Sequence, residues 1–337
     1  MIALQLVGSP TSKLFFRLSM LYAKEVVKPP GFDLLFAIAH PDSTWSVSEK
    51  LPRVSKKLSF EEMISQVREA DIAVPHMFCH KGLTSIRIIF EDILNIPVVG
   101  SPGHTAAISQ DKFLTKTICE NAGILVPNGQ LIKISDQNDT AQMLDFPVIV
   151  KPNSADNSDG LSLVQDKKEY QTALEKCAQF GNEILVETYI PGREIRAAIL
   201  YMDGKFIVPS FIEYGVNEKR PIRYAEDKLK FDDGQLISQS DKKMVPSVCP
   251  AKINKDLKNE LTKIMKKAHL ALHCRDFSMY DFRIHDKTNK PYILETGLFW
   301  SFSKTSMISK MLASDNQDLK TITQRIWLNA YSRRSER

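Results

Sequence analysis

Long apolar runs are missing from this chain, and none reaches the roughly 18 residues that a membrane-spanning helix needs. The first residues, Met-Ile-Ala-Leu-Gln-Leu-Val-Gly, also lack the basic segment and the longer apolar core of a secretion signal. Cysteine is scarce, and its five scattered positions form neither a disulfide framework nor a paired zinc-finger pattern. These absences predict a cytoplasmic protein without a membrane partner.

Charge of one sign is limited as well. The 45 basic residues exceed the 40 acidic residues by only five. Nucleic-acid binders usually carry a larger and more clustered surplus, so we expect no nucleic-acid partner and a mild attraction for anionic small molecules. Neither a Gly-x-Ser-x-Gly elbow nor a Walker-type lysine loop occurs, so hydrolase and P-loop functions have no support.

The 337 residues, of which 43% are hydrophobic and 25% charged, suit a globular protein of two or three packed subdomains. Strands and helices alternate in the first hundred residues, which predicts an open α/β domain over residues 1–107. A strand–loop–helix–strand unit is expected over 108–194, and a third unit with two hairpins over 195–337. The predicted fold class is therefore α/β (α+β).

Individual elements follow from hydrophobic periodicity and turn residues. Asp203-Gly204 lies between two apolar runs and predicts a hairpin. The expected strands of the first two units are at 2–7, 32–38, 72–74, 97–100, 146–151 and 184–190. The expected helices include 110–122, ended by Gly123, and 257–272. Residues 215–250 are polar and are expected to form a long loop.

The last predicted hairpin carries two carboxylates. Asp281 and Arg283 share one strand face, and a turn at 286–290 would place Asp281 opposite Glu295. Their Cβ atoms would then be roughly 5 Å apart, a separation at which two carboxylates repel unless a cation lies between them. Mg²⁺ takes one or two carboxylates together with phosphate oxygens, and Arg283 could stabilise a transferring phosphoryl group. The alternative is an exposed hairpin face with ordinary charges.

Several residues before this hairpin could bind a nucleotide. Lys151 ends an apolar strand, where a charge needs an anionic partner, and Lys112 lies on the preceding helix. The loop 153–160 offers backbone N–H groups and hydroxyls to phosphates, although its two aspartates count against this interpretation. Glu187 and Glu194 could bind an adenine amine and ribose hydroxyls. Each residue taken singly could also be an ordinary surface residue.

The order of these motifs resembles ATP-grasp ligases of the D-alanine–D-alanine ligase type, over residues 95–310. The matching segments are Asp111-Lys112, Phe146-Pro-Val-Ile-Val-Lys151-Pro152, Ile184-Leu-Val-Glu187, Pro191-Gly192-Arg193-Glu194, and Asp281 to Glu295. The resemblance implies an ATP-grasp fold, ATP and Mg²⁺ as cofactors, small-molecule substrates, and the homodimer common among relatives.

Site roles follow from the same resemblance. It implies that Lys112 and Lys151 contact phosphates, and that Asn157, Ser158 and Gly160 belong to a phosphate-covering loop. Glu187, Tyr189 and Ile190 would hold adenine, Glu194 the ribose, and Asp281 and Glu295 the metal. Lys228 resembles a catalytic phosphate lysine carried by a mobile loop.

The chain departs from that pattern at three places. Gly297 stands where the family has a third metal ligand, an asparagine. Met279 stands where the family has its catalytic arginine, and Arg283 on the same strand face is expected to substitute. The segment 298–306, Leu-Phe-Trp-Ser-Phe-Ser-Lys-Thr-Ser, replaces a Gly-Met-Thr substrate loop. These departures disfavour an orthodox D-alanine–D-alanine ligase.

A narrower resemblance covers nearly the whole chain. The segments 75–84 and 221–228, Asp281-Phe-Arg283 and Leu294-Glu-Thr-Gly-Leu-Phe-Trp-Ser-Phe302 are similar to mycosporine-like amino acid ligases. This similarity implies that ATP phosphorylates the enaminone oxygen of mycosporine-glycine, after which serine, threonine or a similar amino acid displaces phosphate to form an imine. A dipeptide ligase and an ATP-binding protein without chemistry are the alternatives.

Substrate contacts are expected from residues near the predicted cleft: His76, Phe78, Trp300, Ser301 and Ser306. For Trp300, as for Phe302, packing in the core is an alternative to contact with a ring-shaped substrate. His76, Cys79 and His80 could also be metal ligands, although a place in the substrate pocket is the preferred interpretation.

Overall fold

The computed structural model describes residues 1–51, 56–134, 145–155, 158–224, 227, 231–232, 235–236 and 245–334. Its strands are β1 (Ile2–Gly8), β2 (Asp33–Ala39), β3 (Trp45–Ser48), β4 (Ile72–Pro75), β5 (Gly129–Lys133), β6 (Val148–Pro152), β7 (Ser162–Val164), β8 (Glu183–Thr188), β9 (Gly192–Met202), β10 (Lys205–Ile207), β11 (Ile212–Tyr214), β12 (Phe231–Asp232), β13 (Gln235–Leu236), β14 (Ser247–Val248), β15 (Phe277–His285) and β16 (Pro291–Gly297). Its helices are α1 (Lys13–Lys24), α2 (Phe60–Val67), α3 (His80–Leu83), α4 (Ser85–Ile88), the π-helical turn η1 (Ile89–Ile93), α5 (Gly103–Gln110), α6 (Lys112–Asn121), α7 (Lys167–Ala178), α8 (Lys255–Ala271), α9 (Met307–Ser314) and α10 (Leu319–Ser332).

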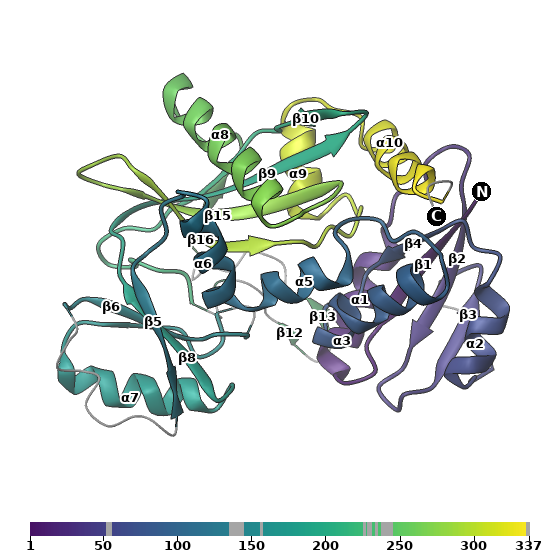
Figure 1. Ribbon diagram of the computed structural model, residues 1–337, viewed down its shortest axis with the longest axis horizontal. Helices are drawn as coiled ribbons and strands as arrows, with labels where there is room; N and C mark the ends of the chain where they lie inside the picture. The colour runs from purple at the N-terminus through teal and green to yellow at the C-terminus, as the bar shows by residue number, and fades with distance from the viewer. Residues whose placement is uncertain are drawn as a thin grey trace.

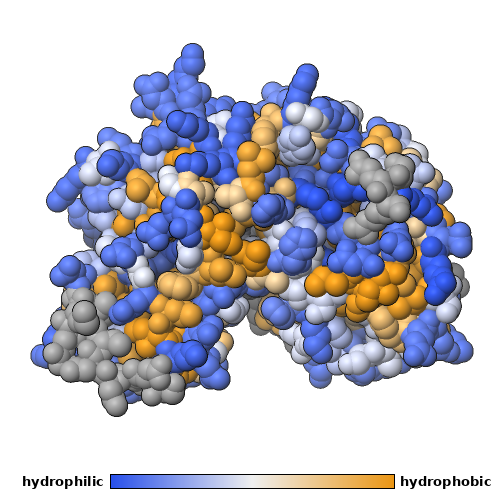
Figure 2. Space-filling view, viewed as in Figure 1, coloured by the Kyte–Doolittle hydropathy of each residue, from blue (hydrophilic) through white to orange (hydrophobic). Residues whose placement is uncertain are grey.

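Three larger sheets organise the chain, which confirms the predicted mixed α/β class (Figure 1). The N-terminal sheet has the order β3-β2-β1-β4, with β1 parallel to both β2 and β4. A second sheet, β5-β8-β6-β7, is antiparallel and carries α7. The third sheet, β14-β11-β9-β15-β16 with β10 beside β9, lies above and between the other two in Figure 1. In Figure 2 the surface is hollowed between the two lower lobes.

Local sequence signals account for most boundaries. Ser59 and Glu62 form a capping box at the start of α2. Asp203 and Gly204 both have positive φ, and Lys205 pairs with Met202, so the predicted hairpin is confirmed. Gly192 is required at the start of β9, because a Cβ there would lie 2.0 Å from the Ile284 carbonyl oxygen.

Three sequence expectations differ from the structure. The predicted strand at 97–100 is a single parallel bridge between Val98 and Ala73. The edge strand β3 was not predicted, because four residues are too few for its alternation of apolar and polar side chains to stand out. The predicted helix 110–122 is shorter at its start, because the Asp111 side chain caps α6 by accepting a hydrogen bond from Leu114 N–H.

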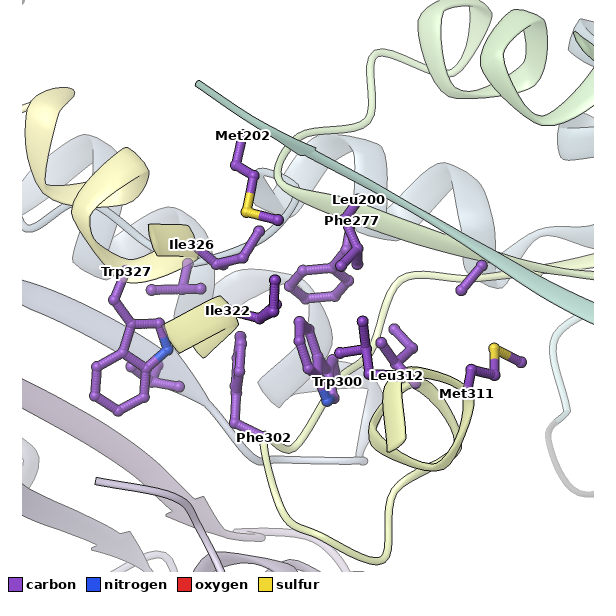
Figure 3. Packing of buried hydrophobic residues seen from close by; sticks show 14 of the residues in the cluster. Leu200, Met202, Phe277, Trp300, Phe302, Met311, Leu312, Ile322, Ile326 and Trp327 are labelled. Carbon is purple, nitrogen blue, oxygen red and sulfur yellow. The ribbon is translucent and has the colours of Figure 1, made fainter. Parts of the chain in front are cut away.

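The largest aromatic cluster lies beneath β9 and β15 (Figure 3). Trp300 and Phe302 stack with ring centroids 4.2 Å apart, and Phe277 meets Trp300 edge-on at 5.6 Å. Trp327 on α10 contacts Phe302 from the other side. The loop after β16 is therefore anchored in the core, which fixes where the strand carrying Glu295 ends.

We predict that Trp300→Ala lowers the free energy of unfolding by about 3–5 kcal/mol, because it opens a cavity in this cluster. Chemical denaturation followed by circular dichroism measures the change. The matched control is Leu270→Ala, since Leu270 is 64% exposed and should shift stability by about 0.5 kcal/mol or less. Equal effects of the two substitutions would contradict a core role for Trp300.

Candidate active site

The β15–β16 hairpin brings the two predicted carboxylates together. Asp281 pairs directly with Glu295 across the hairpin. A β-bulge produces this pairing, because Phe282 pairs with Ile293 and the register shifts by one residue at Asp281. Without the bulge Asp281 would face Leu294. The bulge therefore sets the two carboxylates side by side.

Asp281 is held by an arginine that the sequence interpretation missed. Arg196 lies opposite Asp281 on β9 and donates from Nε and Nη2 to its two oxygens, both at 2.6 Å. Burial alone would raise the pKa of Asp281, but the charge and hydrogen bonds of Arg196, together with the charge of Arg223, outweigh burial and lower the pKa. Asp281 is therefore a carboxylate in the folded protein. Alternation on β9, where Glu194 and Arg196 share a face, was the signal that could have found Arg196.

A lysine cluster surrounds Glu187 on β8. Lys151 at the end of β6 lies 2.7 Å from one Glu187 oxygen, and Lys116 on α6 binds the other. Burial would raise the pKa of Glu187, but the two lysines outweigh it and lower the pKa. Burial also lowers the pKa of Lys116 to about 8. Glu187, proposed from sequence as an adenine contact, thus also positions two cations.

Lys116 is a second missed residue. Lys116 lies four residues, or one helical turn, after Lys112 on α6. This helical spacing puts both lysines on one face of the helix and was the signal that could have identified Lys116. Lys112 Nζ lies 3.3 Å from Glu295 and donates to the Ala155 carbonyl at 2.5 Å. Helix α6 therefore links the carboxylate hairpin to the loop after β6.

That loop is the predicted phosphate loop. Ser158 lies in it with a positive φ, and its hydroxyl donates to the Arg223 carbonyl at 3.1 Å. Gly160 also has a positive φ, and a Cβ there would lie 2.8 Å from Pro152, so it shapes the turn. Asn157 and Lys228 lie outside the described residues.

Many of these side chains line one cavity. Its wall includes Tyr189, Ile190 and Glu194, as well as apolar Ile149 and Leu294. The predicted phosphate and metal residues line the same cavity: Lys112, Lys151, Ser158, Asp281 and Glu295. Among the described residues, the charged side chains that line the cavity are four cationic and five anionic: Lys112, Lys151, Arg223, Arg283, Asp159, Glu187, Glu194, Asp281 and Glu295. Lys116 and Arg196 do not line it, and they pair with Glu187 and Asp281.

A second cavity, which we call the acceptor chamber, adjoins the first. Its wall includes Tyr22 of α1, Phe78 and Phe299. The Phe78 and Phe299 rings lie 4.2 Å apart, and Tyr22 and Phe78 lie 5.5 Å apart. The wall therefore combines the N-terminal unit with the loop after β16.

The two departures from the family pattern on the hairpin are neighbours in this chamber. Met279 pairs directly with Gly297 across β15 and β16, and both line the chamber. A Cβ at Gly297 would lie 3.2 Å from the Met279 methyl carbon. A side chain at 297 would therefore press against the end of the Met279 side chain, which would have to shift by a few tenths of an ångström.

Several predicted substrate residues lie elsewhere. Trp300 is buried in the core, and its Nε1 donates to Ser306 and Ser309. Ser301 is fully buried and bonds Ser303. Trp300, Ser301 and Ser306 are buried and line neither of the two cavities, and their contact with substrate stays a prediction.

His76 also lines neither cavity, so its predicted contact with substrate stays a prediction. It is fully buried and bonds Gln5 at 2.7 Å through Nε2. Of the predicted substrate contacts, Phe78 does line the chamber. The chain direction after β4 explains the difference, since His76 continues the strand into the core and Phe78 follows where it ends.

The donor set at Asp281 and Glu295 fits Mg²⁺. Two adjacent carboxylates suit a cation that completes its shell with phosphate oxygens and water. The Glu295 side chain is 37% exposed and so reachable. Within the described ranges no group of three or more His, Cys, Asp or Glu could hold a metal, which disfavours His76, Cys79 and His80 as ligands. The carboxylate pair suits a metal that is bound together with a nucleotide.

Comparison with known proteins agrees with this geometry. The profile of the family "D-ala D-ala ligase C-terminus" matches residues 119–327. An uncharacterized protein, y4sG, of Sinorhizobium fredii is 30% identical over 60% of this chain and 57% of its own length. A D-alanine–D-alanine ligase of Maridesulfovibrio salexigens is 27% identical over 74% of this chain and 77% of its own.

Solved structures share the fold. A D-alanine–D-alanine ligase from Bacillus anthracis, complexed with ATP, has a TM-score of 0.74 at 19% identity, covering 100% of this chain and 98% of that one. Among the described residues, no helix is both long and apolar enough to cross a membrane.

We predict that His76 makes the protein less stable in acid. Burial lowers the pKa of His76 to about 3, whereas the unfolded chain takes up this proton near pH 6.5. The contribution of neutral His76 to the free energy of unfolding is thus fully present above pH 6.5 and is lost as the pH falls toward 3. At pH 5 the loss is about 2 kcal/mol.

Urea unfolding of wild type and His76→Gln at pH 7 and pH 5 measures this loss. The glutamine keeps a polar group near Gln5 but does not titrate, so its stability should fall less between the two pH values. Comparing the change in unfolding free energy between the two pH values in wild type and variant removes the contribution of other titrating groups. His269 is one such group, because burial lowers its pKa to about 4. Parallel profiles would contradict the prediction.

Proposed function

The chain belongs to the D-alanine–D-alanine ligase family, and we propose that it is an ATP- and Mg²⁺-dependent carbon–nitrogen ligase that joins an amino acid to mycosporine-glycine. The family profile covers more than half of the chain. The fold is that of ATP-grasp ligases. The acceptor and the amino acid are the parts of this proposal that extend beyond the family.

One observation carries the proposal: the nucleotide cavity and the acceptor chamber meet at the same side chains. Lys112, Arg223, Asp281 and Glu295 line both. A phosphoryl donor in the first cavity and an acceptor in the second would therefore face each other across the carboxylate pair. Proximity of this kind accounts for much of the rate enhancement in group transfer.

The aromatic wall supports a flat ring as the acceptor. Tyr22, Phe78 and Phe299 offer ring faces and edges on which a cyclohexenone could stack. Met279 opposite Gly297 adds an apolar surface beside the carboxylates. The similarity of segments 75–84 and 221–228 to mycosporine-like amino acid ligases supports the same acceptor.

The proposed reaction has two steps. The enaminone oxygen forms a bond to the γ-phosphorus of ATP while the bond to the bridging oxygen breaks, and ADP keeps that electron pair. The amine of serine, threonine or a similar amino acid then attacks the ring carbon, phosphate leaves with the C–O electron pair, and loss of the amine proton gives the imine. Mg²⁺ at Asp281 and Glu295 would supply charge neutralisation for the phosphates.

A dipeptide ligase is the second candidate, and family membership supports it equally. In that case an amino acid carboxylate would accept the phosphoryl group in the same chamber. An ATP-binding protein without chemistry is less consistent with Asp281 and Glu295, because both line the junction of the two cavities.

The proposal also carries expectations about context. A reaction that consumes ATP suits the cytoplasm, and a homodimer is expected from the relatives. We retain 1–107, 108–194 and 195–337 as the proposed division into units. Sedimentation and limited proteolysis would measure assembly and boundaries.

The test of function is ADP release with Mg-ATP, mycosporine-glycine and a panel of amino acids, with absorbance spectra recorded in parallel. Release that requires both partners, together with red-shifted absorbance, is the expected result. Release with amino acids alone would favour the dipeptide ligase. If no combination of mycosporine-glycine and an amino acid releases ADP, and amino acids alone release none, the ligase assignment is overturned.

We predict that Asp281→Asn and Glu295→Gln each reduce kcat on the order of 10²-fold or more, because each removes charge that organises the metal and phosphates. Steady-state assays measure kcat, and circular dichroism checks the fold. Glu213→Gln is the matched control, since Glu213 lies in the same sheet and pairs with Arg193 outside both cavities. Wild-type rates in both variants would remove the metal assignment.

A further inference from the structure

An alternating chain of charges crosses the third sheet at the junction of the two cavities. Arg283 binds Glu194 at 3.0 Å, and Arg223 Nε binds the other Glu194 oxygen at 2.5 Å. Arg223 Nη2 lies 3.7 Å from Asp281, which Arg196 clamps from the far side. Arg223 is therefore the central cation, and it alone of the three arginines comes from outside β9 and β15.

The three arginines differ in what their donors do. Arg196 uses Nε and Nη2 on Asp281. Arg283 uses Nη1 on the Gly192 carbonyl and Nη2 on Glu194 and the Pro221 carbonyl. Within the described part of the chain, Arg223 makes one side-chain hydrogen bond, through Nε, so both terminal nitrogens keep donors for a ligand.

The location of Arg223 adds to this difference. Arg223 lines both cavities, whereas Arg283 lines the nucleotide cavity and Arg196 the acceptor chamber. The Arg223 side chain is only 7% exposed, and its guanidinium lies 3.5 Å from the centre of the Tyr214 ring. A guanidinium stacked in this way is fixed in orientation.

The backbone of Arg223 is also tied to the site. Its carbonyl accepts from Ser158 in the predicted phosphate loop, and Arg283 holds the neighbouring Pro221 carbonyl at 2.6 Å. The segment 221–223 is thus fastened over the nucleotide cavity from two sides. The Arg223 side chain lines both cavities, at the junction across which a phosphoryl group would pass from nucleotide to acceptor.

We infer that Arg223 is the arginine that contacts the transferable γ-phosphate, and that Arg283 is a positioning residue that holds segment 221–223 in place. The inference rests on the proposed function for the identity of the ligand, a nucleoside triphosphate. Arg223 binds oxygens of the phosphoryl group through its terminal nitrogens and transfers no proton. This assignment replaces the expectation from sequence that Arg283 stabilises the phosphoryl group.

The test is a comparison of two nucleotides by calorimetry with Mg²⁺: ADP and the non-hydrolysable triphosphate AMP-PNP. Arg223→Met keeps much of the side-chain volume and removes the donors. We expect AMP-PNP affinity to fall about tenfold or more, because bonds to a charged group are lost, while ADP affinity changes little. Arg223→Lys should restore part of the loss, since it keeps the charge without the fork.

Two further variants make the result specific. Arg193 lies on β9 and binds Glu213 outside both cavities. The control variant Arg193→Met should therefore leave the affinities for ADP and AMP-PNP unchanged. Arg283→Met should weaken both nucleotides together, as expected of a positioning residue. Thermal melting of each variant confirms that it is folded.

An equal change in ADP and AMP-PNP affinity for Arg223→Met, or no change, would overturn the inference. A loss confined to AMP-PNP in Arg283→Met would overturn it as well, and would return the role to Arg283. Because these are binding measurements, they stand apart from the turnover assay: a protein that releases no ADP with any acceptor fails the proposed function alone.

Discussion

The ion pair between Arg196 and Asp281 is the interaction on which the site depends. A carboxylate buried on a central strand costs several kcal/mol unless a cation accompanies it. Arg196 lies directly across β9 and β15 and satisfies both oxygens of Asp281. Because that charge is balanced, Glu295 on β16 can lie next to Asp281. Arg223, from the irregular segment 221–223, also lies near Asp281. The remaining ion pairs extend the same alternation through Glu194 to Arg283 in the wall of the first cavity.

Helix α6 connects this sheet with the second one. Lys112 reaches Glu295 and the loop after β6, while Lys116, one turn later, reaches Glu187 on β8. The same helix packs its apolar face against the core of the third sheet through Cys119. The relative position of the two sheets, and hence the width of the cavity between them, is therefore coupled to the pairing of buried charges. Removal of one lysine would leave a buried carboxylate undercompensated, which is more disruptive than loss of a surface ion pair.

Sequence reasoning succeeded where chemistry follows from local pattern. The hairpin pairing of Asp281 with Glu295 came from strand alternation and turn placement, although a bulge was needed to produce it. It failed where the partner is distant in sequence. An aromatic residue such as Trp300 looks the same in a pocket wall and in a core, and only long-range packing against Phe277 and Trp327 distinguishes the two. Arg223 lies in an irregular segment, so no periodicity could place its guanidinium.

The contact between Met279 and Gly297 has a consequence for how this hairpin can vary. A side chain at 297 would come within 3.2 Å of the Met279 methyl group, and that methyl group is the flexible end of its chain. A larger residue at 297 therefore requires the Met279 methyl group to shift by a few tenths of an ångström, and a shorter residue at 279 would widen the chamber beside the carboxylates. The two positions are coupled through this contact. A bulkier residue on one strand packs with the least adjustment when its neighbour on the other strand is smaller.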